Sequence, residues 1–202
     1  MKEYLYASEA ETAPILMGED SIGFDYVGQT ELTASNVFSP DQVGVAEFRE
    51  ALVNFRDAAY ELDKFKKALF RKRNRQESGL PVLENGQYPF DYGRSLGYLI
   101  QGMGHDDLFH GIVGVATESG EQVEILIDVL DGKRPDVTNV REEIGDVLWY
   151  LARLVKWAGT TFLTEMRRNI AKLRKRHGNA GFNKEADINR NLSEERKLLE
   201  GE

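Results

Sequence analysis

Residues 110–154 read HGIVGVATESGEQVEILIDVLDGKRPDVTNVREEIGDVLWYLARL, and this stretch decides the fold. Apolar residues recur at steps of three and four on both sides of Gly132, which is the spacing of one buried helix face. A glycine placed just after the last apolar residue commonly ends a helix. The stretch therefore predicts two long helices joined by a turn at Gly132, the first of them covering about residues 106–130.

Four acidic residues interrupt the apolar pattern of these two helices. Glu118 and Glu121 lie three residues apart on the first helix, and Glu143 and Asp146 repeat that spacing on the second. Residues three apart share a helix face, and the two pairs are placed symmetrically about Gly132. An antiparallel hairpin would set Glu118 opposite Asp146 and Glu121 opposite Glu143, so we expect the four carboxylates to converge in one patch.

Such a patch needs compensating positive charge, because like charges repel strongly where water is excluded. A hard divalent cation with oxygen ligands supplies that charge, and Mg²⁺ commonly binds together with substrate phosphates. The chain has no cysteine and only three histidines, which favours Mg²⁺ or Mn²⁺ over zinc. The alternative interpretation is a solvated acidic stripe, the usual meaning of a single Glu-x-x-Glu on a helix.

Di-iron carboxylate bundles also place acids inside a helical bundle, but they use two Glu-x-x-His motifs. This chain offers a single Asp107-Leu-Phe-His110. At a rise of about 1.5 Å per residue, His110 lies about 12 Å along the helix from Glu118, too far for the two to share a metal. We interpret His110 as a histidine of the core or as support for the metal ligands.

The remaining patterns predict an all-α fold, a helical bundle of four to five main helices with a small irregular or hairpin region added. Ser39-Pro40-Asp41-Gln42 has the residues of a helix start, and an apolar stripe follows through about residue 73. Pro135 is expected in the first turn of the second hairpin helix, with Asn139 and Glu142 as a capping pair. Further helices are expected from Phe162 to Gly178 and over residues 193–199.

We expect one helical domain over residues 39–202, with an insert at 74–91 and a polar tail at 183–202. Residues 1–38 form a weakly patterned extension, in which the alternation of Ile22, Phe24 and Tyr26 suggests a short strand. Turn residues around Asn85-Gly86 suggest a small hairpin in the insert. A short helix is expected over residues 92–101.

Composition excludes several classes of protein. Of the 202 residues, 41% are hydrophobic and 30% charged, which is ordinary for a globular domain. No apolar run reaches the length of about 18 residues needed to span a membrane, and the N-terminal segment lacks the apolar core of a secretory signal. The net charge of −8 disfavours stable nucleic-acid binding. Since the absence of cysteine fits a reducing compartment, a cytoplasmic protein is expected.

Three segments together resemble the MazG-like members of the all-α nucleotide pyrophosphohydrolases. They are HGIVGVATESGEQVEIL at 110–126, NVREEIGDVLWYLARL at 139–154 and NIAKLRKRHG at 169–178. The family carries a Glu-x-x-Glu, a spacer and a Glu-x-x-Asp on two helices of a bundle, and the likeness covers roughly residues 105–200. His177-Gly178 departs from the family pattern, in which an aromatic residue or proline is expected after the arginine.

The resemblance implies a Mg²⁺-dependent enzyme that hydrolyses a nucleoside triphosphate to the monophosphate and pyrophosphate by a metal-activated water. It makes Glu118, Glu121, Glu143 and Asp146 the metal ligands, and Glu121 is our guess for the acid that takes the proton. It also matches Asn169, Lys172 and Arg176 to the residues on the phosphate side. Their spacing puts these three on one helix face, although a solvated basic helix end would look the same.

Alternatives remain open at the level of substrate and activity. A narrower enzyme acting on dCTP, dUTP or phosphoribosyl-ATP would carry the same acids, as would a non-catalytic helical protein that binds nucleotide or a partner. Trp149 and Tyr150 could stack a base, although aromatic residues on an apolar helix more often pack in the core. Family members commonly form homodimers or homotetramers, so the resemblance implies a homo-oligomer.

Overall fold

The structure is a computed structural model that describes residues 25–35, 37–82, 104–178 and 181–200. The described residues contain helices and no strand, so the predicted all-α class is confirmed. In chain order the elements are α1 (Tyr26–Thr33), the 3-10 turn η2 (Pro40–Gln42), α2 (Val45–Phe70), α4 (Asp106–Leu130), α5 (Val137–Trp157), α6 (Phe162–His177), α7 (Lys184–Ile188) and α8 (Leu192–Glu200).

The chain divides into two compact units, which are described separately. One unit is Asn36–Glu165, and the other combines Met1–Ser35 with Met166–Glu202. The predicted single domain over residues 39–202 stays a prediction. The hairpin expected near Asn85 and the short helix expected over residues 92–101 lie outside the described residues.

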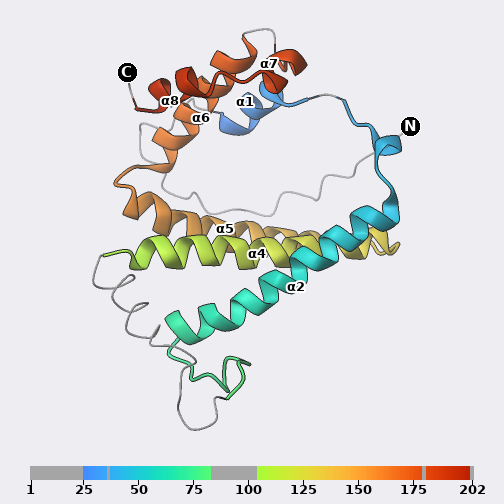
Figure 1. The fold of residues 1–202 in the computed structure, drawn as a ribbon, viewed down its shortest axis with the longest axis vertical. Helices are drawn as coiled ribbons and strands as arrows, with labels where there is room; N and C mark the ends of the chain where they lie inside the picture. The colour runs from blue at the N-terminus through green and yellow to red at the C-terminus, as the bar shows by residue number, and fades with distance from the viewer. Residues whose placement is uncertain (1–24, 36, 83–103, 179–180, 201–202) are drawn as a thin grey trace, which may run out of the picture. The chain divides into compact units, whose positions relative to one another are not determined.

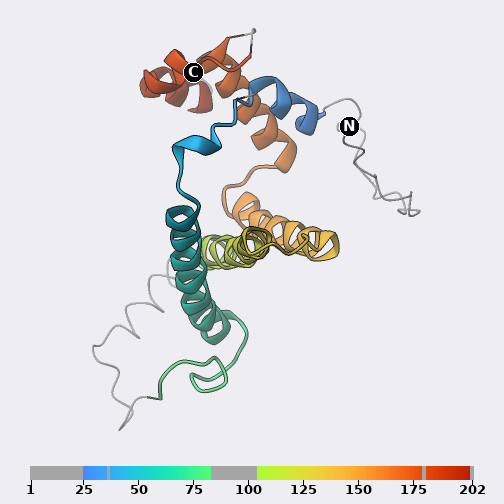
Figure 2. The ribbon, with the colours of Figure 1, turned by 90° about the vertical axis from the view of Figure 1, so that its right-hand side faces the viewer.

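The unit Asn36–Glu165 is built on the antiparallel pair α4 and α5, with α2 packed across α4 (Figure 1). The view turned by 90° shows α2 running across this pair (Figure 2). Helix α4 has the predicted bounds, and Gly132 makes the turn with a φ of 85°. The turn is closed by backbone hydrogen bonds, Gly132 to Val129 at 3.1 Å and Lys133 to Asp128 at 2.9 Å. This positive φ suits a glycine.

Two predicted helix starts are wrong. Helix α2 begins at Val45 with Gly44 as its N-cap, because the extended backbone of Val43 separates it from the short 3-10 turn at Pro40. Helix α5 is capped by Asp136, whose carboxylate accepts hydrogen bonds from the backbone amides of Thr138 and Asn139. Aspartate is a preferred N-cap, so Pro135 lies before the helix and the Asn139–Glu142 pair does not cap it.

Gly114 of α4 lies directly against the Tyr150 ring of α5. A Cβ added to Gly114 would lie 1.9 Å from Cδ1 of the Tyr150 ring. The ring is buried there, so the glycine provides the space for the ring. Gly145 on α5 is the opposite case, since an added Cβ meets no described atom within 4 Å.

These two glycines give a paired prediction on stability. Gly114→Ala should lower the free energy of unfolding by about 1–3 kcal/mol, because the Tyr150 ring must move in a packed core. Gly145→Ala should raise it by about 0.5–1 kcal/mol through helix propensity alone. Urea unfolding followed by circular dichroism measures both changes, and a Gly114→Ala protein as stable as Gly145→Ala would contradict the packing described.

The second unit contains α1, most of α6, α7 and α8. Tyr26 starts helix α1, so at this residue the predicted strand is wrong, and Ile22 and Phe24 lie outside the described residues. The Tyr26 hydroxyl donates to Oδ1 of Asn169 on α6 at 3.3 Å. Helix α6 ends before Gly178, and α8 confirms the predicted polar terminal helix. Among the described residues, no helix is long and apolar enough to cross a membrane.

Candidate metal centre and active site

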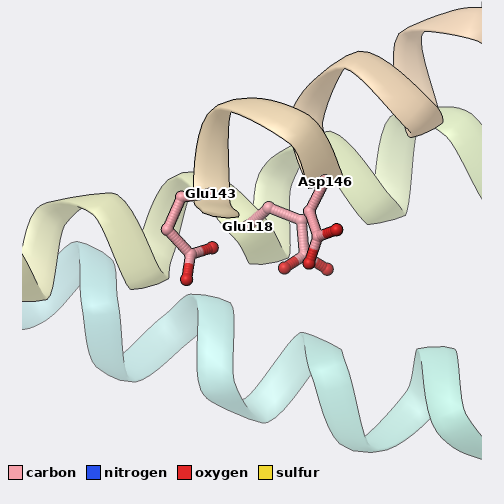
Figure 3. A group of neighbouring side chains, drawn as sticks. All are labelled: Glu118, Glu143 and Asp146. Carbon is pink, nitrogen blue, oxygen red and sulfur yellow. The ribbon is translucent and has the colours of Figure 1, made fainter. Parts of the chain in front are cut away.

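Three carboxylates from α4 and α5 form a cluster (Figure 3). Glu118 comes from α4, Glu143 and Asp146 come from α5, and one oxygen of each lies within 4.8 Å of the others. Glu118 and Glu143 are only 5% and 3% exposed, whereas Asp146 is open to solvent. The antiparallel hairpin therefore brings Glu118 and Asp146 together, as the symmetry about Gly132 predicts.

Glu121, the fourth predicted ligand, is not a member of this group of three but lies next to it. Its carboxyl is partly buried, and burial followed by the charge of Glu118 raises its pKa. Glu121 also lines two cavities, one of which includes Glu143 of the cluster in its wall. Its position at the edge of the group suits contact with a bound substrate as well as with a metal.

Glu143 shows most directly that the cluster fits a cation. Burial, and then the charges of Glu121, Glu118 and Asp146, raise the pKa of Glu143 to about 7. Its Oε2 is buried and accepts no hydrogen bond from any described residue. A buried carboxylate oxygen without a donor is costly, and a donor set made only of oxygens suits a hard divalent cation.

Lys66 of α2 is the residue of this site that the sequence analysis missed. It is 1% exposed, and its Nζ lies 2.6 Å from Glu118 Oε1, 2.7 Å from Thr117 Oγ1 and 3.0 Å from Asp63 Oδ1. Burial lowers the pKa of Lys66, but the hydrogen bonds to Glu118 and Asp63 outweigh it, so the pKa is raised. The protein itself thus supplies one positive charge to the carboxylates.

A signal for Lys66 is present in the sequence. It follows Ala59 and Leu62 at steps of seven and four, which places it on the apolar stripe of α2 instead of the charged face. A lysine on a core-facing stripe needs a buried partner. Glu118 is likewise a charged residue among the apolar residues of a neighbouring helix, so it also needs a buried partner.

His110 belongs to the core, as the sequence analysis proposed. Its ring stacks on Phe70 with centroids 4.2 Å apart and meets the Tyr150 ring edge-on at 5.4 Å. Burial, and then the charge of Arg153, lower its pKa. Tyr150 is buried, which agrees with a packing role, whereas Trp149 is half exposed.

The three predicted phosphate-side residues lie on α6 in the other compact unit. Arg176 is held by Glu195 through two bonds of 2.8 and 2.9 Å and approaches Asp187 at 3.3 Å. Asn169 accepts from Tyr26, and Lys172 is half-buried. Arg176 therefore fastens α8 to α6, and a role of these residues in phosphate binding stays a prediction.

The Arg176–Glu195 pair predicts how this unit responds to acid. The hydrogen bond from Arg176, and then that from Arg190, lower the pKa of Glu195 from 4.5 to about 2. A lowered pKa means that the pair stabilises the fold above the unfolded-state value and that this contribution is lost as the pH falls from about 4.5 towards 2.

Glu195→Gln should therefore cost about 1–3 kcal/mol at pH 7, and this difference from the unaltered protein should shrink as the pH approaches 2. Glu194→Gln is the matched control, because the Glu194 side chain is more open to solvent than that of Glu195 and its ion pair among the described residues is with Lys197, across one helix turn. Denaturant unfolding at several pH values measures both variants. A Glu195→Gln cost that does not change with pH would contradict the assignment.

Comparison with known proteins agrees with this site. The model of the MazG nucleotide pyrophosphohydrolase domain family matches residues 112–180. Over this segment the chain is MazG-like. The MazG-like segment contains all four acids and the three α6 residues, and the family indicates nucleotide pyrophosphohydrolase activity in general. Neither curated proteins nor solved structures gave a significant match to the chain.

Proposed function

We propose that the chain is a Mg²⁺-dependent nucleoside triphosphate pyrophosphohydrolase that releases the monophosphate and pyrophosphate. The observation that carries the proposal is the group Glu118, Glu143 and Asp146, whose oxygens gather within 4.8 Å on two antiparallel helices. The MazG-like match over the same residues supports the reaction class. Mn²⁺ is an alternative cation with the same oxygen preference.

The carboxylates would hold the metal ion, which in such sites lowers the pKa of water and offsets phosphate charge. Lys66 holds Glu118 through Oε1 at 2.6 Å, which would leave the second carboxylate oxygen of Glu118 for the metal ion. Glu121 is the proposed acceptor of the proton released on hydrolysis, since its raised pKa and its place beside the cluster suit that role. Of Lys172 and Arg176, Lys172 has no ion pair with a described residue, whereas Arg176 is held by Glu195, so Lys172 is the stronger candidate of the two for phosphate contact.

We also propose that the protein is a homodimer or homotetramer. Exposed apolar side chains on α5, among them Ile144 at 50% and Leu148 at 47% exposure, support an interface on that helix. A contiguous apolar patch on a protein surface is one of the features that mark an interface between subunits. Light scattering at several concentrations measures the assembly, and a monomer throughout would remove this part of the proposal.

The decisive experiment measures pyrophosphate and orthophosphate separately across a panel of ribo- and deoxyribonucleoside triphosphates. The panel includes dCTP, dUTP and phosphoribosyl-ATP. We expect pyrophosphate release that requires Mg²⁺ and stops with a chelator. Release of orthophosphate alone, or turnover that persists in chelator, would reject the proposed reaction, and turnover restricted to one substrate would identify a narrower enzyme.

A further inference from the structure

A cavity of about 510 Å³ lies beside the carboxylate cluster, between α2 and the segment that follows it. Its walls come from α2, from residues 73–79 and from Glu121 of α4. Since Glu121 also lies next to the cluster, it links the cavity wall to the candidate metal centre. Helix α2 and residues 73–79 both lie outside residues 112–180, which match the family model. Most of the cavity wall therefore belongs to a part of the chain that the family match does not cover.

The charges around the cavity suit an anionic group better than those of the other cavity at the site. Three cationic side chains, Lys64, Lys67 and Arg73, face three carboxylates in its wall. The second cavity, of about 310 Å³ at the α4–α5 turn, has two cations against five carboxylates. A polyphosphate would meet net repulsion in the second cavity and a balanced field in the first.

Ser78 gives an independent indication of a ligand in the first cavity. Its side chain lines the cavity and is 4% exposed, yet its Oγ has no hydrogen-bond partner among the described residues. Buried hydroxyls in proteins almost always have a partner. The surrounding segment is well held, because Asn74 and Glu77 exchange two hydrogen bonds of 2.9 Å, so the position of Ser78 is set by the fold.

Of the three cations in the cavity wall, Arg73 is the best placed to give its positive charge to a bound anion. Lys64 and Lys67 each pair with an acid on α2, Glu61 and Asp63 respectively. Arg73 is exposed and makes no ion pair with any other described residue. Its planar guanidinium can bind two phosphate oxygens at once.

We propose that this cavity binds the terminal phosphates of the substrate, the part that leaves as pyrophosphate, through Arg73 and the Ser78 hydroxyl. The proposal rests on the proposed function for the identity of the substrate. With the phosphates in this cavity, the nucleoside would extend from the metal centre on the side of the second cavity. The segment after α2 then takes part in holding the substrate.

The test is calorimetric titration of the full chain with inorganic pyrophosphate in the presence of Mg²⁺. Arg73→Gln should weaken pyrophosphate binding by about tenfold to a hundredfold, the loss expected for a charge-assisted hydrogen bond. Lys72→Gln is the matched control, because Lys72 is the adjacent exposed cation and does not line the cavity. It should bind pyrophosphate within about twofold of the unaltered chain, a difference close to RT or less.

Ser78→Ala provides a second readout that does not change charge. Removal of a hydroxyl that binds phosphate should weaken pyrophosphate binding by about threefold to tenfold. The helical circular dichroism should stay unchanged. Unchanged pyrophosphate affinity in both Arg73→Gln and Ser78→Ala would overturn the proposal. An unaltered chain that binds no pyrophosphate would overturn it as well.

The outcome separates this proposal from the proposed function. Hydrolysis of triphosphates with the same KM in Arg73→Gln and in Lys72→Gln would reject the cavity and leave the enzyme assignment intact. Pyrophosphate binding that depends on Arg73, in a chain that hydrolyses no triphosphate, would support the cavity and reject the enzyme.

Discussion

Glu143→Gln is expected to lower Mg²⁺-dependent pyrophosphate release by at least about a hundredfold, since loss of even an outer partner of a metal ligand costs about 10- to 100-fold. Glu143 is 3% exposed, and its Oε2 has no hydrogen-bond donor among the described residues. The substitution keeps the shape of the side chain and removes its charge. Initial rates measured with saturating triphosphate at several Mg²⁺ concentrations give the loss.

Glu142→Gln is the matched control, because it makes the same chemical change one residue away on the exposed face of α5. It should retain the activity of the unaltered protein. Equal loss in both variants would mean that the general charge of α5, and not the cluster, supports turnover. Full activity in Glu143→Gln would remove Glu143 from the metal site.

Although Glu143→Gln should lower activity, it should make the metal-free protein more stable. A buried carboxylate beside two others is costly without a cation, so Glu143→Gln should raise the thermal midpoint in chelator. Mg²⁺ should then raise the midpoint of the unaltered protein more than that of the variant, because only a native-state ligand stabilises the fold. A variant that is less stable in chelator would contradict the repulsion inferred from the raised pKa of Glu143.

The hairpin could be predicted from the sequence because its determinants are local. Helix periodicity, the glycine at residue 132 and the repeated acid spacing all lie within one stretch, and the structure confirms the bounds of α4 and the meeting of Glu118 with Asp146. The predicted starts of α2 and α5 failed for an equally local reason. Several residues near each start could cap a helix, and sequence patterns do not decide which one forms the hydrogen bonds.

Lys66 could not be paired with Glu118 from the sequence, because that contact joins residues far apart in the chain. Its distance from Glu118 depends on how α2 crosses α4, and helix crossing angles take several values for similar apolar stripes. The cavity wall at Ser78 was unforeseen for the same reason. A buried charge on a predicted core stripe remains the signal that could have been followed.

Lys66→Met should lower the free energy of unfolding by about 3–5 kcal/mol in chelator, the second large effect expected for this protein. Methionine fills a similar volume but leaves the 5%-exposed Glu118 without its 2.6 Å partner. Lys67→Met is the matched control on the same helix. Lys67 pairs with the same Asp63 but is 33% exposed, so its loss should cost about 1 kcal/mol at most.

A double-mutant cycle separates the charge of Lys66 from its packing. Adding Glu118→Gln to Lys66→Met removes the carboxylate that the first change leaves unpaired, so the double variant should be more stable than Lys66→Met alone. Mg²⁺ should also restore part of the stability of Lys66→Met, because a cation at the cluster would offset the charge of Glu118 in place of the ammonium. Unfolding free energies that are additive across the cycle, together with no effect of Mg²⁺, would show that Lys66 only fills space. Coupling in the cycle would instead show that α2 holds Glu118 in position through a buried ion pair, which makes this helix part of the metal centre.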